Sequence, residues 1–241
     1  MRRFITLLGL CVFATALCSA TTISLTPVSD GLGTIGDPSL FSVLGGTITI
    51  GSNGATNITL QFDYPQTSLS TPYSWNGIVV QPADLLFKAG NDDYGLAIVN
   101  HSLAPDNASH PSAYSTVTAG DFYSTTFFET AQTVLGNPPK VTYRNSDPVW
   151  MGGTQTELGS LSETISRVGN EYTVTFAGTL PTAFITDLDA NGVTAYFGSA
   201  TCANGYMTGS APPPGVPEPT SLLLLGSGLL GLGGMVRRRI R

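Results

Sequence analysis

The sequence predicts an all-β protein with a single β-sandwich or jelly-roll-like domain, preceded by a signal peptide and followed by a C-terminal transmembrane helix. Three observations support this prediction. Short runs of alternating polar and apolar residues, rich in Thr, Val, Ile, Tyr and Phe, fill the middle of the chain. Turn-forming Gly, Asn, Asp and Pro separate these runs. Each end of the chain combines an apolar segment with a cluster of Arg residues.

Residues 1–20 have the organisation of a secretory signal peptide. Two arginines directly after the first methionine provide the positive charge, and the apolar run over residues 4–17 is short for a membrane span. Small residues precede the predicted cleavage site, which lies between Ala20 and Thr21. We therefore expect the chain to engage the secretion machinery and to be exported.

Residues 21–211 are expected to form the single folded domain, with about ten short strands. The expected strands cover residues 22–25, 47–50, 57–62, 77–81, 94–99, 123–130, 141–144, 162–168, 171–176, 185–188 and 193–197. Gly and Asn residues between these runs predict hairpin turns at 52–54, 169–170 and 190–192. The run over residues 82–90 fits either a short helix or a buried strand, and its neighbours favour the strand.

The charge of this domain differs from that of the whole chain. Residues 21–215 contain four Lys and Arg against fifteen Asp and Glu, a net charge of −11, whereas the whole chain carries −6. Such a domain offers no basic patch for phosphate groups, so nucleic-acid binding is excluded. Once the signal peptide is removed only Cys202 is left, and an internal disulfide is excluded as well.

Two short segments follow the domain. Residues 212–215 form a linker of Pro and Gly. The next four residues are Val216, Pro217, Glu218 and Pro219. The two prolines that flank the acid cannot continue a helix, so they hold this segment extended.

The last part of the chain is a candidate membrane span. Residues 220–236 are apolar and uncharged, and as a helix they would span about 26 Å, slightly less than a bilayer core of about 30 Å. Arginines that snorkel to the membrane surface cover this difference, and the positive-inside rule places them in the cytoplasm. These arginines are Arg237, Arg238, Arg239 and Arg241.

The order of these parts resembles a PEP-CTERM sorting signal. The resemblance covers residues 216–241 and rests on the Pro-Glu-Pro motif, the Leu- and Gly-rich span and the closing arginines. It implies that a membrane-embedded transpeptidase of the exosortase type recognises the motif and cuts the chain there. It also implies a Gram-negative type of bacterium that makes extracellular polysaccharide. We therefore expect a transient membrane anchor with a cytoplasmic C-terminus, followed by a location at the cell surface or outside the cell.

An acidic segment near the end of the domain is a candidate calcium site. Asp187, Asp189 and Asn191 follow the D-x-D-x-N-G pattern that opens an EF-hand loop. Gly198 stands at the twelfth position, where an EF-hand needs a bidentate Glu, so an EF-hand is excluded. A looser calcium site made of turn oxygens and a plain hairpin turn are the two interpretations left. No other cofactor is expected.

The sequence shows no catalytic constellation, and the protein is expected not to be an enzyme. His101 and His110 lie in a polar loop without the spacing of metal ligands, and they are expected to face solvent. No Gly-x-Ser-x-Gly motif accompanies them, which disfavours a serine hydrolase. Cys202 has no histidine near it in sequence and is expected to be a small buried residue.

Carbohydrate chemistry supplies two further alternatives. Candidate carboxylates of a glycoside hydrolase, by residue type alone, are Glu129, Glu157, Glu163 and Glu171, the last two of which are expected to point to solvent. Candidate platforms for sugar binding are Trp75 with Tyr73 and Trp150 with Tyr143, although burial of each Trp in the core is preferred.

The leading hypothesis is a non-enzymatic protein of the cell surface or the extracellular matrix, processed by an exosortase-like enzyme. A carbohydrate-binding module for extracellular polysaccharide is the alternative, and a secreted hydrolase is the third hypothesis.

Overall fold

Antiparallel β-strands make up most of the structure, a computed structural model that describes residues 20–28, 38–75, 78–102, 116–135, 146–214 and Gly226. The strands are Thr21–Pro27 (β1), Val43–Ile50 (β2), Ala55–Asp63 (β3), Tyr73–Trp75 (β4), Ile78–Val80 (β5), Leu85–Ala89 (β6), Asp92–Leu96 (β7), His101–Ser102 (β8), Thr116–Val117 (β9), Asp121–Thr130 (β10), Pro148–Ser160 (β11), Ser162–Val168 (β12), Glu171–Thr179 (β13), Val193–Gly198 (β14) and Tyr206–Ala211 (β15). The helices are Pro38–Leu40 (η1, a 3-10 helix), Ala131–Leu135 (α1) and Thr182–Asn191 (α2).

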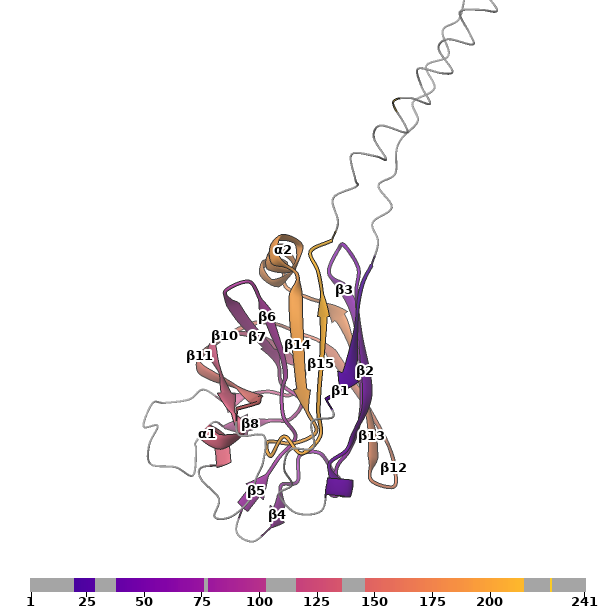
Figure 1. Ribbon diagram of the computed structural model, residues 1–241, viewed down its shortest axis with the longest axis vertical. Helices are drawn as coiled ribbons and strands as arrows, with labels where there is room; N and C mark the ends of the chain where they lie inside the picture. The colour runs from indigo at the N-terminus through magenta and orange to yellow at the C-terminus, as the bar shows by residue number, and fades with distance from the viewer. Residues whose placement is uncertain are drawn as a thin grey trace, which may run out of the picture.

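Eleven of these strands belong to one antiparallel sheet. Their order across it is β11-β10-β7-β6-β14-β15-β1-β2-β3-β13-β12, and β4–β5 and β8–β9 form two small separate sheets. β1 joins the two halves, because Thr21 to Leu25 pair with β2 while Thr26 and Pro27 pair with β15. The all-β prediction is confirmed. The two sheets expected of a sandwich are instead connected through β1 into one curled sheet (Figure 1).

The hydrophobic core lies inside the curl. Along β3 every second residue is buried, and Ile58, Leu60 and Phe62 are fully inaccessible, which is the period of a strand with one face in the core. Phe62 packs edge-on against Phe197 of β14, with ring centroids 5.1 Å apart. Side chains from the two halves of the sheet therefore meet directly, and each large one contributes roughly 1.5–3 kcal/mol of burial.

Two of the expected hairpin turns are confirmed. Residues 51–54 connect β2 to β3, and Gly169 with Asn170 connects β12 to β13. Gly54 and Gly169 have φ angles of 78° and 65°, a left-handed conformation that glycine adopts without strain. The run over residues 82–90 contains β6, so the strand interpretation of that run is confirmed.

The third expected hairpin, at residues 190–192, is wrong, and so is the strand expected over residues 185–188. The chain forms α2 there instead. The helix buries Phe184 and Leu188, which lie one turn apart on the same face. The ring of Phe184 lies 5.3 Å from that of Phe87 and edge-on to it, so α2 packs an aromatic side chain into the core.

Local signals for α2 are present in its sequence. Pro181 stands at the N-cap, where a missing N–H costs nothing. Gly192, with φ of 72°, ends the helix by donating its N–H to the carbonyl of Leu188 at 2.8 Å. The Asn-Gly pair at its end resembles a hairpin turn as closely as it resembles a helix end, which explains the error.

The sequence analysis does not predict β11 and β15. β11 and β15 contain three and one glycines respectively, which weakens the alternation of polar and apolar residues on which the prediction relies. The strand expected over residues 141–144 lies outside the described residues.

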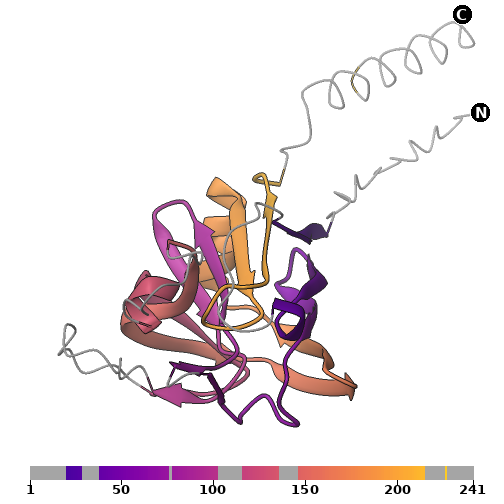
Figure 2. The ribbon, with the colours of Figure 1, turned by 60° about the horizontal axis from the view of Figure 1, so that its bottom comes forward.

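The two edge strands of the sheet, β11 and β12, follow each other in the chain with only Leu161 between them. Leu161 is buried and donates its N–H to the carbonyl of Gly120 at 2.8 Å. The sheet therefore curls until its edges approach at this residue. Away from it, the β12–β13 hairpin projects from the body (Figures 1 and 2).

The start of β1 and the end of β15 lie at the same end of the molecule, because the two strands are antiparallel neighbours (Figure 2). No helix among the described residues combines the length and the apolar character that crossing a membrane requires. The predicted signal peptide before Ala20, and the predicted span over residues 220–236 apart from Gly226, lie outside the described residues.

Candidate functional site

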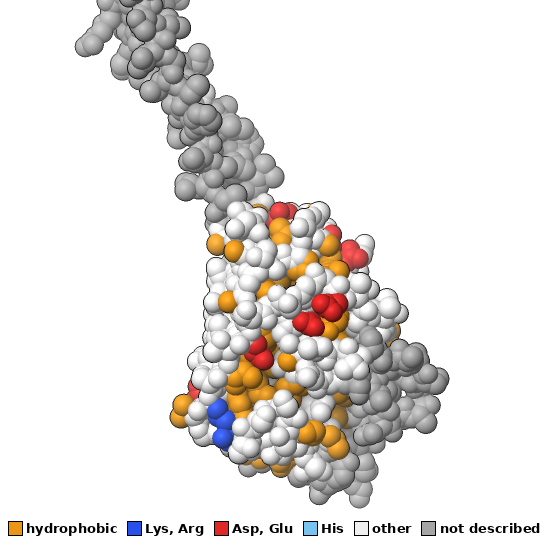
Figure 3. All heavy atoms as spheres, turned by 180° about the vertical axis from the view of Figure 1, so that it is seen from behind, with side chains coloured by type: hydrophobic (Ala, Val, Ile, Leu, Met, Phe, Trp, Pro, Cys, Tyr) orange, Lys and Arg blue, Asp and Glu red, His pale blue; other side chains and the backbone are white. Residues whose placement is uncertain are grey.

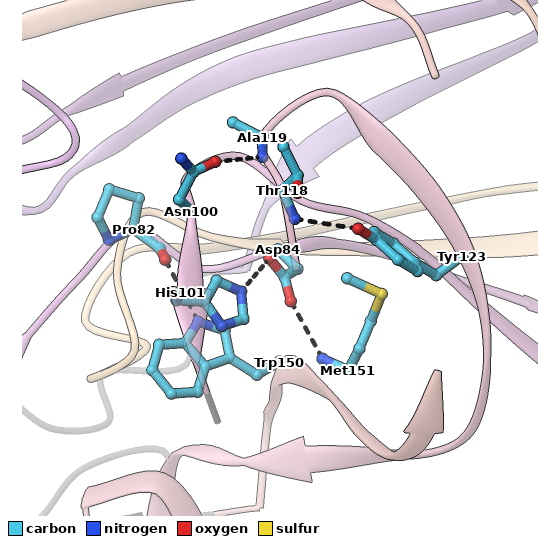
Figure 4. A network of polar contacts seen from close by, with 9 residues as sticks. All are labelled: Pro82, Asp84, Asn100, His101, Thr118, Ala119, Tyr123, Trp150 and Met151. Atoms are coloured by element: carbon cyan, nitrogen blue, oxygen red, sulfur yellow. Dashed lines mark hydrogen bonds and ion pairs between the residues drawn. The ribbon is translucent and has the colours of Figure 1, made fainter. Parts of the chain in front are cut away.

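A buried polar cluster lies where the start of β6, β8 and β11 meet (Figure 4). Asp84 is fully buried, and its Oδ1 lies 2.9 Å from Nε2 of His101. Its Oδ2 accepts a hydrogen bond of 3.1 Å from the backbone N–H of Met151. Both oxygens of the carboxylate therefore have partners, as a buried charge requires.

The ring of His101 is also held by an aromatic neighbour. It stacks on the indole of Trp150, with centroids 4.4 Å apart and an interplanar angle of 7°. Trp150 donates from Nε1 to the carbonyl of Pro82 at 3.4 Å. Just before the histidine, Asn100 accepts a hydrogen bond of 2.7 Å from the N–H of Ala119 (Figure 4). These contacts tie three segments that are distant in sequence into one unit.

The burial of this pair limits its chemistry. The side chain of His101 is 1% exposed, so the expectation that it faces solvent is wrong. Because Asp84 accepts from Nε2, the hydrogen-bond network assigns a proton to that nitrogen, and Nδ1 is buried without a hydrogen-bond partner in the described part of the chain. An Asp–His pair orients a general base in hydrolases, but a base must reach its substrate, and these two side chains are covered. His110 lies outside the described residues.

The sequence carries a signal for this burial at Asp84 rather than at His101. Asp84 interrupts the apolar run over residues 82–90, for which a buried strand is expected. A carboxylate in such a strand needs a donor or a cation beside it. The identity of that partner depends on which loop returns to the start of β6, and local sequence does not encode this.

The structure does not place the calcium candidates in a loop. Asp187, Asp189 and Asn191 lie on α2, where side chains two positions apart point to different sides. Asp187 accepts a hydrogen bond from the hydroxyl of Tyr94, and burial, reinforced by this carboxylate, raises the pKa of Tyr94 above its usual value. The turn geometry on which the calcium interpretation rests is therefore wrong. Within the described ranges, no three His, Cys, Asp or Glu side chains gather in a way that could hold a metal ion.

Cys202 is fully buried, as predicted. Burial raises its pKa to about 12, so the thiol stays protonated at neutral pH. Because the thiolate is the reactive form, this cysteine is not a nucleophile in the folded protein.

The candidate carboxylates of a glycoside hydrolase lie on two pairs of neighbouring strands, β10 with β11 and β12 with β13. Glu129 is 6% exposed in β10, and Glu157 follows on β11. Glu171 on β13 is exposed, as predicted. Glu163 on β12 differs from the expectation, because one of its carboxylate oxygens is buried without a hydrogen-bond partner and burial raises its pKa.

The candidate sugar platforms are only partly described. Trp150 is 8% exposed and stacked on His101, so the preferred interpretation of a core residue is confirmed for it. Tyr73 is half-buried and packs edge-on against Phe41. The side chain of Trp75 and all of Tyr143 lie outside the described residues.

The predicted processing sites flank the sheet closely. Thr21, which follows the predicted signal cleavage site, is the first residue of β1, and Ala20 before it is exposed. β15 ends at Ala211, and the described chain continues to Pro214. The sorting motif that begins at Val216 and the C-terminal arginines lie outside the described residues.

These features define a curled β-sheet domain that is followed within a few residues by a separate tail. Residues 215–239 of that tail match the PEP-CTERM protein-sorting motif. The chain therefore carries this motif, and the resemblance found in the sequence is confirmed over that segment. The motif implies export and processing by an exosortase, a membrane enzyme. No curated protein and no solved structure matches the chain.

Proposed function

We propose that this protein is a non-enzymatic component of the cell surface or the extracellular matrix, delivered as a folded β-domain and cut at its C-terminus by an exosortase-type transpeptidase. One observation carries the proposal. The match to the PEP-CTERM motif begins at residue 215, directly after Pro214, the last described residue of the domain. The folded part and the sorting signal therefore adjoin without an intervening domain.

The short spacing supports a role of the domain as cargo. Six residues lead from Ala211, the end of β15, to Pro217. Six extended residues reach at most about 22 Å. While the tail is in the membrane, the domain is consequently held next to the bilayer, with the start of β1 on the same side (Figure 2). Cutting at the motif removes this tether and leaves the domain intact.

The surface of the domain supports a soluble extracellular role. Acidic side chains are scattered over the face seen in Figure 3, and basic ones are rare there. The net charge of −11 over residues 21–215 keeps such a domain dispersed and repels anionic polymers unless a divalent cation bridges them. The covered Asp84–His101 pair and the protonated Cys202 are consistent with a protein that acts without catalysis.

The test is the fate of variants in the sorting motif. Glu218→Gln, and separately Pro217→Ala with Pro219→Ala, are expected to leave the full-length tail attached and the protein in the membrane fraction. The matched control is Pro212→Ala with Pro213→Ala, which removes two prolines just outside the motif. Mass spectrometry of the membrane and culture fractions measures the ratio of precursor to product. Processing of the motif variants at the rate of the control would refute the proposal.

A further inference from the structure

β12 is a regular edge strand with an open side. Its seven residues pair with β13 without a register shift, and no strand of the described part pairs with its other side. Every residue of β12 except Glu163 is exposed, and Ile165 and Val168 are 46% and 82% exposed. A strand edge of this kind is a template for pairing with another chain.

Three side chains of β12 point to the inner face of the sheet. Glu163, Ile165 and Arg167 share one face because alternate residues of a strand do so. The β13 residues directly opposite them are buried in the core: Phe176, Val174 and Tyr172. The guanidinium carbon of Arg167 lies 5.6 Å from the centroid of the Tyr172 ring. An acid and a base thus flank an exposed isoleucine on the apolar side of an edge strand.

Neither of these charges has an ionic partner among the described residues. Only two ion pairs occur there, and neither includes Glu163 or Arg167. One carboxylate oxygen of Glu163 is buried without a hydrogen-bond partner. The two side chains cannot pair with each other, because four residues along a strand separate them by about 13 Å. Inward-pointing charges on an edge discourage a foreign strand, which would bury them unpaired.

We propose that the β12 edge binds β12 of a second copy of this chain, antiparallel and about a two-fold axis that passes through Ile165. In this register Ile165 faces itself, and Thr164 faces Ser166 of the second copy. Glu163 faces Arg167 of the second copy, and the symmetry repeats this pair. A second copy therefore neutralises both charges that repel an unrelated strand. The charges on β12 therefore favour β12 of a second copy over an unrelated strand.

The contact between two β12 strands is small, and this determines how the dimer is best detected. One seven-residue strand on each side buries less than the roughly 1,000 Å² of a stable interface, so the association is weak and depends on a high local concentration. A cell surface coated with the protein provides that concentration. The inference concerns the folded domain and does not depend on whether the tail is cut. A covalent trap that captures a transient dimer is the suitable readout.

The trap is a disulfide between introduced cysteines in the full chain, purified in detergent. Side chains directly opposite in an antiparallel pair have Cβ atoms about 4.5–5.5 Å apart, so a shift of about 1 Å brings two Ile165→Cys thiols within the range of a disulfide across the axis. The control is Val168→Cys, which is more exposed but faces Ser162 in this register. Its two thiols would lie six positions apart along the strands, about 20 Å. The unsubstituted chain, which contains Cys11, Cys18 and the buried Cys202, gives the background of the same experiment.

Mild oxidation followed by a non-reducing gel is expected to give at least about tenfold more dimer for Ile165→Cys than for Val168→Cys. Equal yields, or more dimer from Val168→Cys, would overturn the register and with it the proposal. If exposure alone controlled the dimer yield, Val168→Cys would give more dimer than Ile165→Cys, because Val168 is the more accessible residue.

Charge reversal provides a second, independent test in the Ile165→Cys background. Glu163→Arg alone and Arg167→Glu alone each convert two attractive pairs into two repulsive ones, and each is expected to lower the dimer yield about tenfold. The combination of both changes restores opposite charges and is expected to restore the yield. A double variant as weak as the single ones, or single variants as strong as the parent, would show that the two copies do not meet in this way.

Discussion

Asp84→Leu removes the carboxylate at the centre of the buried cluster. His101 and the N–H of Met151 then lose their common acceptor. Met151 is fully buried and the histidine side chain is 1% exposed, so neither donor can turn to water instead. Each buried donor left without an acceptor costs about 1–3 kcal/mol, so the loss of both is expected to cost about 2–6 kcal/mol. This is a large part of a domain stability of about 5–15 kcal/mol.

His101→Phe tests the other side of the pair. A phenyl ring can keep the stack on Trp150, but it leaves the Asp84 carboxylate with the Met151 N–H as its only donor among the described residues. Leaving this buried carboxylate without its side-chain partner is expected to cost about 3–5 kcal/mol. The double variant removes both groups and leaves only the Met151 N–H without an acceptor, which costs about 1–3 kcal/mol. The two single costs should therefore exceed the double cost by at least about 3 kcal/mol.

Urea unfolding of residues 21–214 at pH 7, followed by tryptophan fluorescence, measures these free energies. Trp150 is a suitable reporter because it is buried against His101 and becomes exposed on unfolding. Equal m-values among the variants establish that the comparison concerns the same unfolding reaction. Single variants that each lose less than about 1 kcal/mol, or single costs that simply add, would refute the reasoning, since they would mean that the pair is not a buried, coupled unit.

Three further predictions concern other parts of the domain. Gly192→Ala should cost about 1–3 kcal/mol in urea unfolding, because φ is 72° and the new Cβ would lie 2.5 Å from the carbonyl oxygen of Ala211. Gly169→Ala, where φ is 65° and the added Cβ meets no atom within 4 Å, should cost less, about 1 kcal/mol, and equal losses would contradict the role of the close contact. Burial raises the pKa of Glu163, because the folded protein favours the protonated carboxyl group. The resulting stabilisation is complete below the usual carboxyl pKa of about 4.3 and is lost as the pH rises through the raised value. Glu163→Gln should therefore raise the melting temperature at pH 7 but not at pH 3.5 in dilute samples, and a shift of equal size at both pH values would contradict this. Because Asp187 accepts a hydrogen bond from Tyr94 and the candidate ligands lie on a helix, millimolar calcium should leave the melting temperature unchanged, whereas a rise that chelator reverses would restore the calcium interpretation.

Local sequence predicts that β12 is a strand, whereas its self-pairing depends on its position in the folded sheet. The alternation in β12 predicts a strand, and the Gly169–Asn170 turn after it predicts its pairing with β13. That β12 is an edge follows from the order of all eleven strands. The exposure of Ile165 and the unpaired oxygen of Glu163 are consequences of that order, so they are visible only in the folded chain.

Local sequence patterns alone predict the all-β class, the hairpin turns at residues 52–54 and 169–170, and the sorting tail. These features depend on residues that are close together in the chain. The remaining features depend on contacts between segments that are distant in the chain. His101 is buried because Asp84, 17 positions away, needs a donor, and that carboxylate also accepts from Met151, 67 positions away. α2 prevails over a hairpin because Phe184 fills the core between strands distant in sequence. Local patterns record which backbone conformation a segment prefers, whereas burial and pairing depend on which distant segments meet it.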